Sequence, residues 1–73
     1  MRKVLLTEKQ QYLFNFLVSF FKQNDQIPPA EVIRDHFGWS SANAAYQMMI
    51  CLEKRGHIKR NSVGKWMFCR DEQ

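Results

Sequence analysis

The stretch Ser40–Gly56 reads Ser-Ser-Ala-Asn-Ala-Ala-Tyr-Gln-Met-Met-Ile-Cys-Leu-Glu-Lys-Arg-Gly, and the rest of the chain can be placed around it. Ser41 is a favourable N-cap because its hydroxyl can accept a free backbone N–H of the first turn. Gly56 can take the left-handed backbone that ends a helix. The stretch therefore predicts a helix over residues 41–55 with one apolar and one polar face. The apolar face comprises Ala45, Met48, Met49 and Leu52, and the opposite face Asn43, Gln47, Ile50 and Lys54, with Ala44 and Tyr46 at its edges.

The polar face of this helix has side chains that can read DNA. Asparagine and glutamine form paired hydrogen bonds with adenine in the major groove, and an alanine methyl can contact the thymine methyl. A helix that enters the groove by its N-terminal end presents Asn43, Ala44 and Gln47 first. A solvated face on an ordinary core helix has the same composition, so the helix alone leaves both interpretations open.

A longer helix is predicted upstream, over residues Thr7–Gln23. Thr7 and Gln10 form a capping-box pattern, in which each side chain satisfies a free backbone donor. Apolar residues at helical spacing cover nearly half of its circumference, which is typical of the central helix of a small core. The alternative is that its margin, with Tyr12 or Val18, contacts a second subunit.

A turn and a short helix connect these two segments. The two prolines in Asn24–Pro29 end the first helix, and Ala30–Phe37 is predicted as the second. Two helices joined by a few residues that include glycine, here Gly38–Ser40, are typical of a helix-turn-helix. Trp39 is expected to pack at that turn; the alternative is that its ring lies against a sugar–phosphate backbone.

After Gly56 the apolar pattern changes to period two. Residues His57–Arg60 and Lys65–Phe68 flank Asn61–Gly64, which predicts a β-hairpin with a four-residue loop. Six of the eleven Lys and Arg residues lie within Lys54–Arg70, and no acidic residue does. Such clustering is typical of a surface that faces phosphates, although a solvated charged hairpin remains the alternative. Arg70–Gln73 is predicted to be a frayed tail.

The predicted fold is mainly α with a small β-hairpin: a winged helix-turn-helix of three helices plus a two-stranded antiparallel wing. It is expected to form one domain over residues 1–73, with a core at about 6–68. The candidate base-contacting residues are Ser41, Asn43, Ala44, Tyr46 and Gln47. The candidate backbone-contacting residues are Ser40, Lys54, Lys59, Arg60 and Lys65.

Composition argues against several classes of protein. The net charge of +4 and the pI of about 9.4 suit an anionic partner. No Gly-rich phosphate loop, nucleophile with a base or pair of carboxylates is evident, so an enzyme, a cofactor and a small-molecule substrate are not expected. Cys51, Cys69, His36 and His57 lack the usual zinc-ligand spacing, and the cysteines are expected to be reduced thiols. No stretch reaches membrane-span length and no signal peptide is evident, so a cytoplasmic location in a bacterium or a phage-infected host is expected.

Several short motifs, in order, closely resemble the N-terminal DNA-binding domain of the LexA repressor family. The resemblance extends from Leu6 to about Phe68. The motifs are Leu6-Thr7-Glu8-Lys9-Gln10-Gln11, Pro28-Pro29, Gly38-Trp39-Ser40-Ser41-Ala42-Asn43-Ala44-Ala45 and Leu52-Glu53-Lys54-Arg55-Gly56-His57-Ile58. The threonine that usually follows the two prolines is Ala30 here, so the second helix is expected to lack a side-chain cap.

The resemblance implies a bacterial or phage DNA-binding domain. Ser41, Asn43 and Ala44 match family positions that face bases in the major groove. The next positions are typically acidic in the family, and here they are Tyr46 and Gln47, which implies a different operator. LexA proteins also carry a second domain with a Ser–Lys self-cleavage pair and most of the dimer contact, and 73 residues cannot hold it.

The function expected from the sequence is sequence-specific binding of double-stranded DNA by a small transcriptional regulator, such as a repressor. One alternative is an excisionase-like protein that bends DNA, and another is a winged helix that binds a protein, as an antirepressor would. The chain is either a stand-alone module or the DNA-binding segment of a longer protein. Dimerisation, through the first helix or the wing, is a further hypothesis.

Overall fold

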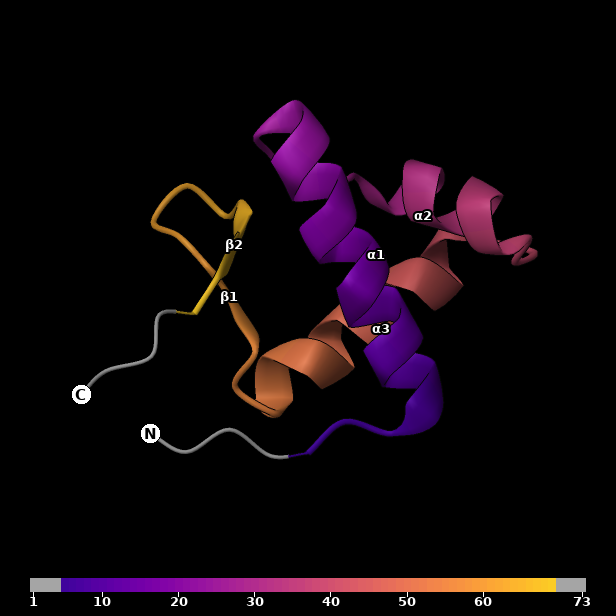
Figure 1. The fold of residues 1–73 in the computed structure, drawn as a ribbon, viewed down its shortest axis with the longest axis horizontal. Helices are drawn as coiled ribbons and strands as arrows, with labels where there is room; N and C mark the ends of the chain where they lie inside the picture. The colour runs from indigo at the N-terminus through magenta and orange to yellow at the C-terminus, as the bar shows by residue number, and fades with distance from the viewer. Residues whose placement is uncertain (1–4, 70–73) are drawn as a thin grey trace.

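The computed structural model describes residues 5–69, so the tail predicted at Arg70–Gln73 lies outside the described residues. The elements follow the order helix, helix, helix, strand, strand (Figure 1). They are α1 (Glu8–Asn24), α2 (Ala30–Phe37), α3 (Ala42–Lys54), β1 (Ile58–Arg60) and β2 (Trp66–Phe68). The two strands pair antiparallel, with Ile58 opposite Phe68 and Arg60 opposite Trp66. The prediction of a winged helix-turn-helix is confirmed.

The start of α1 is fixed by the capping box that the sequence predicts. The Thr7 backbone N–H donates to Gln10 Oε1 at 3.0 Å, and the Gln10 backbone N–H donates to Thr7 Oγ1 at 3.3 Å. Each side chain thus satisfies a donor that the helix leaves free. The helix ends at Asn24, one residue later than predicted, because Asp25 takes the left-handed conformation with φ of 60°.

The ends of α2 and α3 also follow local sequence signals. Helix α2 has the predicted bounds; Pro29 occupies its N-cap position without a side-chain hydrogen bond, as expected, and Gly38 ends it with φ of 71°. Helix α3 begins after Ser41, whose Oγ accepts the Ala44 N–H at 3.4 Å. Gly56 has φ of 85°, just beyond the end of α3.

Each strand is one residue shorter than predicted: His57 lies outside β1, and Lys65 lies outside β2. Backbone pairing still continues past both ends: the Asn61 N–H donates to the Lys65 carbonyl at 2.8 Å, and the Cys69 N–H to the His57 carbonyl at 3.2 Å. The Asn61 side-chain oxygen accepts the N–H groups of Val63 and Lys65 at 3.0 and 2.9 Å. This asparagine turn holds Lys65 in the loop, which therefore covers residues 61–65. We call residues 58–68 the wing.

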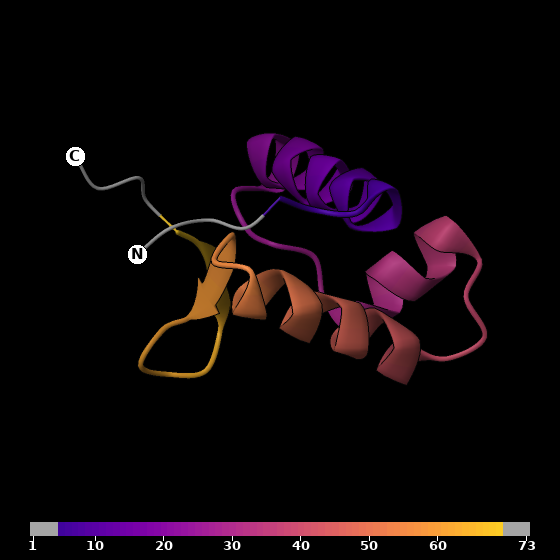
Figure 2. The same cartoon turned by 90° about the horizontal axis from the view of Figure 1, so that it is seen from below.

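The core lies between α1 on one side and α2, α3 and the base of the wing on the other (Figure 2). Met48 is half-buried rather than fully inward, because it lies at the margin of the face that α3 turns to the core. Trp39 packs against the core, as expected, and stacks on Phe37 with ring centroids 5.0 Å apart. The fully buried apolar side chains are Leu13, Leu17, Ile33, Ala45, Met49, Leu52 and Ile58.

Within residues 5–69, no helix has the length and apolar character needed to cross a membrane. The same residues contain no group of three or more His, Cys, Asp or Glu side chains placed to hold a metal ion. Cys51 and Cys69 are free thiols.

Candidate nucleic-acid interface

The amide side chains of α3 lie on the surface. Asn43 and Gln47 are both exposed, and their spacing of four residues puts them on one face of the helix. The buried residues Ala45, Met49 and Leu52 occupy the opposite side and hold α3 against α1. The core therefore fixes the direction in which the two amides point, away from the body of the protein.

The other candidate base-contacting residues are less freely exposed. Ser41 is exposed, but its hydroxyl oxygen already caps α3, which leaves its own hydrogen available for donation. Ala44 is half-buried and lines a hollow of about 280 Å³ between α1, α2 and α3. Tyr46 is 37% exposed, with its ring turned toward the wing. The five residues therefore lie on one end of α3, but only the amides face solvent without another role.

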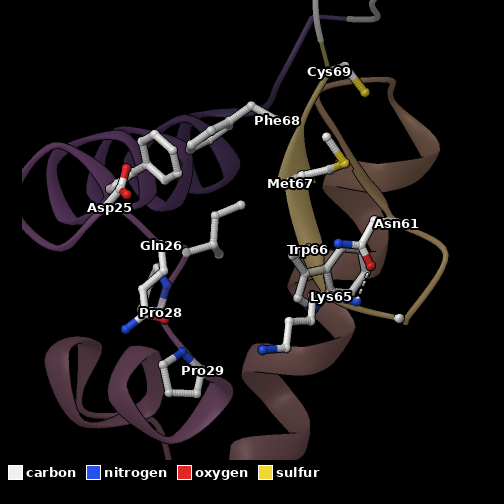
Figure 3. A pocket seen from close by; sticks show the side chains of 13 residues that line it. Asp25, Gln26, Pro28, Pro29, Asn61, Lys65, Trp66, Met67, Phe68 and Cys69 are labelled. Carbon is white, nitrogen blue, oxygen red and sulfur yellow. Dashed lines mark hydrogen bonds between the residues drawn. The ribbon is translucent and has the colours of Figure 1, made fainter.

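The three wing cations point in different directions. Side chains alternate between the two faces of a strand. Arg60 therefore shares the inner face of β1 with the buried Ile58, whereas Lys59 lies on the outer face, opposite Met67. Lys65 belongs to neither strand, and its side chain extends from the loop over an open hollow of about 750 Å³ toward Pro29 (Figure 3). All three side chains are exposed, as are Ser40 and Lys54.

Arg60 has contacts that the sequence did not indicate. Its guanidinium carbon lies 4.6 Å from the centroid of the Trp66 ring and 5.6 Å from that of Tyr46. Its Nη2 lies 3.5 Å from a carboxylate oxygen of Glu53. Trp66 and Glu53 were not among the predicted site residues. The signal that could have found this contact is the alternation in β1, which assigns Arg60 to the same face as Ile58.

The loop of the wing and α3 lie on the same side of the molecule. Figure 2 shows both on the side away from α1, with the wing beyond the C-terminal end of α3. Lys54, at that end, and Lys65, in the loop, are both exposed. The exposed face of α3 and the wing loop thus lie on a common side of the molecule, as the interpretation from the sequence requires of these two elements.

Comparison with known proteins agrees with this geometry. The family model described as the LexA DNA binding domain matches residues 3–64. The LexA repressor of Petrotoga mobilis is 35% identical over 60 residues, which are 82% of this chain and 29% of that protein. The LexA repressor of Verrucomicrobium spinosum is 39% identical over 56 residues, 77% of this chain and 28% of that protein. That of Thermosipho melanesiensis has the same identity and coverage.

The chain spans less than a third of the length of these relatives. The match nevertheless covers all three helices and the first strand, and it includes the residues that form the exposed face of α3. The chain belongs to the LexA DNA-binding domain family.

Proposed function

We propose that this protein binds double-stranded DNA with sequence preference and regulates transcription, with α3 in the major groove and the wing along the backbone. The observation that carries the proposal is the common side shared by α3, whose two amides are exposed, and the wing loop. A recognition helix and a cationic hairpin can contact one duplex together only in that arrangement. Membership of the LexA DNA-binding domain family supports the same conclusion.

The proposed base contacts centre on Asn43 and Gln47. Each exposed amide can donate to and accept from one adenine edge, which discriminates that base from the other three. Ser41 retains a hydroxyl hydrogen for a base or a phosphate, and Tyr46 offers a partly exposed ring at the wing side of the helix. Ala44 supplies a methyl at the edge of the face, suited to a thymine methyl.

The proposed backbone contacts surround the base contacts. Ser40 lies in the turn before α3, Lys54 at the end of α3, and Lys59 and Lys65 on the wing. Cations at these positions would bind phosphates and set the orientation of the domain without reading sequence. Arg60 was predicted to act in the same way, but its guanidinium already contacts Trp66 and Glu53.

The biological setting proposed is the cytoplasm of a bacterium or of a phage-infected cell. One module of this size covers only about 600–1,000 Å² of protein surface on DNA, so tight binding requires a second copy or a partner protein. Two copies on a palindrome, with half-sites separated by about one helical turn or a multiple of it, fit that requirement.

Selection of bound sequences from a random duplex pool, at two salt concentrations, tests the proposal. We expect an enriched motif with adenines at the positions that Asn43 and Gln47 face. The protein variant that carries both Asn43→Ala and Gln47→Ala, tested with the same duplex pool, serves as the control. It should lose the enriched motif but still bind DNA in a salt-sensitive way. Recovery of random sequence by the unchanged protein would contradict sequence-specific binding.

One surface feature favours a second candidate, the binding of a protein. Tyr12 is 62% exposed, and it lines the hollow of about 280 Å³ together with Phe37, Trp39 and Met48. An aromatic hollow of this kind suits an apolar side chain of a partner. Stoichiometric binding of a regulatory protein, combined with DNA affinity that changes little with salt, would favour this candidate over the first.

A further inference from the structure

The two neighbouring cations of β1 have opposite environments. Lys59 is on the outer face of the wing, whereas Arg60 is on the inner face, between β2 and α3. Arg60 stands directly opposite Trp66 in the strand pair, so the two side chains are cross-strand neighbours. One residue of sequence thus separates a cation on the outer face of the wing from one that is still partly exposed but contacts both β2 and α3.

Three side chains from two elements, β2 and α3, meet at Arg60. The guanidinium lies over the Trp66 ring of β2 and within reach of the Tyr46 ring of α3, at centroid distances of 4.6 and 5.6 Å. Both distances are within the range of attraction between a cation and an aromatic face. The Tyr46 and Trp66 rings are themselves 6.3 Å apart, and Glu53 of α3 balances the charge at 3.5 Å.

These contacts differ from the attachment at the base of the wing. The base is held by Ile58, which is fully buried, and by Phe68, which packs edge-on against Phe14 and Phe21 of α1. Nearer the loop, the contacts of the wing with α3 run through Arg60 and Trp66. Both ends are needed to fix the angle of a short hairpin relative to a helix.

We infer that Arg60 is a positioning residue that holds the wing against α3, and that it does not serve as a phosphate contact. The inference rests on the proposed function, in which the wing and α3 meet one duplex together. With the wing held, Lys65 and Lys59 reach the backbone only when α3 is in register with its bases. Arg60 thereby couples phosphate binding to base reading and raises the preference for the specific site over random DNA.

A phosphate contact and a positioning residue respond differently to substitution. If Arg60 met a phosphate, Arg60→Gln would weaken specific and random DNA equally and reduce the salt slope by about 0.9. Arg60→Lys would then preserve most of the affinity, because it preserves the charge. If Arg60 holds the wing, both variants lose the planar guanidinium that lies over the Trp66 ring, near the Tyr46 ring, and pairs with Glu53.

The first experiment needs no DNA. The NMR spectrum of the free protein should show the side-chain protons of Arg60 shifted upfield, because they lie over the face of the Trp66 indole. Trp66→Leu should remove that shift, and Trp39→Phe, which retains a ring to stack on Phe37, should leave it unchanged. Arg60 protons at their ordinary positions in the unchanged protein would overturn the inference.

The second experiment measures binding to a selected site and to random duplex over a salt series. We expect Arg60→Gln and Arg60→Lys to lower the specific-to-random affinity ratio about five- to tenfold, the size of a cation–aromatic contact, with an unchanged salt slope for Arg60→Gln. Lys59→Gln is the contrasting variant and should reduce the slope with little change in the ratio. Lys22→Gln, on α1, removes the same charge as a control and should alter neither quantity.

The two experiments separate the inference from the function on which it rests. A slope reduced by Arg60→Gln, with an unchanged affinity ratio, would overturn the positioning role while DNA binding stands. If no duplex bound the unchanged protein at any salt, the proposed function would fail. An upfield shift of the Arg60 protons that Trp66→Leu removes would then still support a wing held against α3, on a surface that binds something other than DNA.

Discussion

The exposed amide of Asn43 and the exposed ammonium of Lys65 represent the two kinds of contact that the proposed complex requires. Asn43 projects from the first turn of α3, where the buried face of the helix fixes its direction. Lys65 projects from the wing loop, where the Asn61 side chain accepts its backbone N–H. Both side chains are exposed and project from hydrogen-bonded backbone, so their substitution should remove contacts without disturbing the fold.

Asn43→Ala should weaken binding to the preferred site by about 1–3 kcal/mol and relax the base preference at one position. The physical reason is the loss of a paired hydrogen bond that only one base can complete. Fluorescence anisotropy with the selected duplex and its single-base variants measures both effects. Asn15→Ala, at an exposed position of α1, is the matched control and should bind as the unchanged protein does.

Lys65→Ala should weaken specific and random duplexes by the same factor and reduce the salt slope by about 0.9. A phosphate contact releases counterions whatever the sequence, which is why the two duplexes respond alike. Anisotropy titrations across a salt series provide the measurement. If Lys65→Ala changed base preference, or if Asn43→Ala changed random and specific binding equally, the assigned roles would be wrong.

At the scale of elements, short-range contacts and backbone conformation determine where helices α1 and α2 begin or end. The capping box of Thr7 and Gln10 satisfies two donors at the start of α1. Gly38 ends α2 with φ of 71°, and beyond its two chain neighbours no described atom lies within 4 Å of where a Cβ would stand. Substitution at Gly38 therefore tests backbone strain alone, without a steric clash.

Thr7→Ala should lower the free energy of unfolding by about 1 kcal/mol, the usual effect of removing a hydroxyl N-cap. Urea unfolding followed by circular dichroism measures the change. Thr7→Ser is the matched control, because it keeps the hydroxyl and should retain most of the stability. Equal losses in the two variants would indicate that the threonine methyl, and not the cap, stabilises α1.

Gly38→Ala should lower the free energy of unfolding by about 1–2 kcal/mol, because an L-residue in the left-handed region meets its own carbonyl. Gly38→Asn should cost less, since asparagine tolerates this conformation. The same urea titration compares the two. A Gly38→Ala variant as stable as the unchanged protein would mean that the turn before α3 can adjust its backbone.

At the scale of the whole molecule, binding depends on how many cations one domain brings to the duplex. Within residues 5–69, Lys54, Lys59 and Lys65 are exposed and form no ion pair, whereas Arg60 is paired with Glu53. Three phosphate contacts per domain correspond to a slope of roughly −2.7 in a plot of log affinity against log salt concentration. The salt slope therefore reports how many of these lysines contact phosphates.

We expect a slope near this value on a duplex with one half-site and about twice the value on a palindrome that holds two copies. Titrations on the two duplexes, with sedimentation to count bound copies, provide the measurement. A single copy on the palindrome, with the slope of the half-site, would contradict paired binding.

Sequence alone determined the elements and their order. The caps and turns at Thr7, Ser41 and Gly38 involve atoms only a few residues apart. Helical periodicity determines which face of each helix is buried. The helix boundaries and the buried faces are therefore both encoded locally. The motifs that resemble the LexA family contain the same residues. The candidate amides Asn43 and Gln47 were predictable for this reason: they lie opposite the apolar stripe of one helix.

Only the tertiary structure decided what the cations of the wing do. Lys59 and Arg60 are adjacent and look equivalent in the sequence, but Arg60 lies against Tyr46 and Glu53 of α3, and Lys59 does not. That contact forms only in the folded domain, where Ile58 and Phe68 pack the base of the wing against the core and bring β1 beside α3. The contact results from long-range packing, and no local pattern in the sequence encodes it.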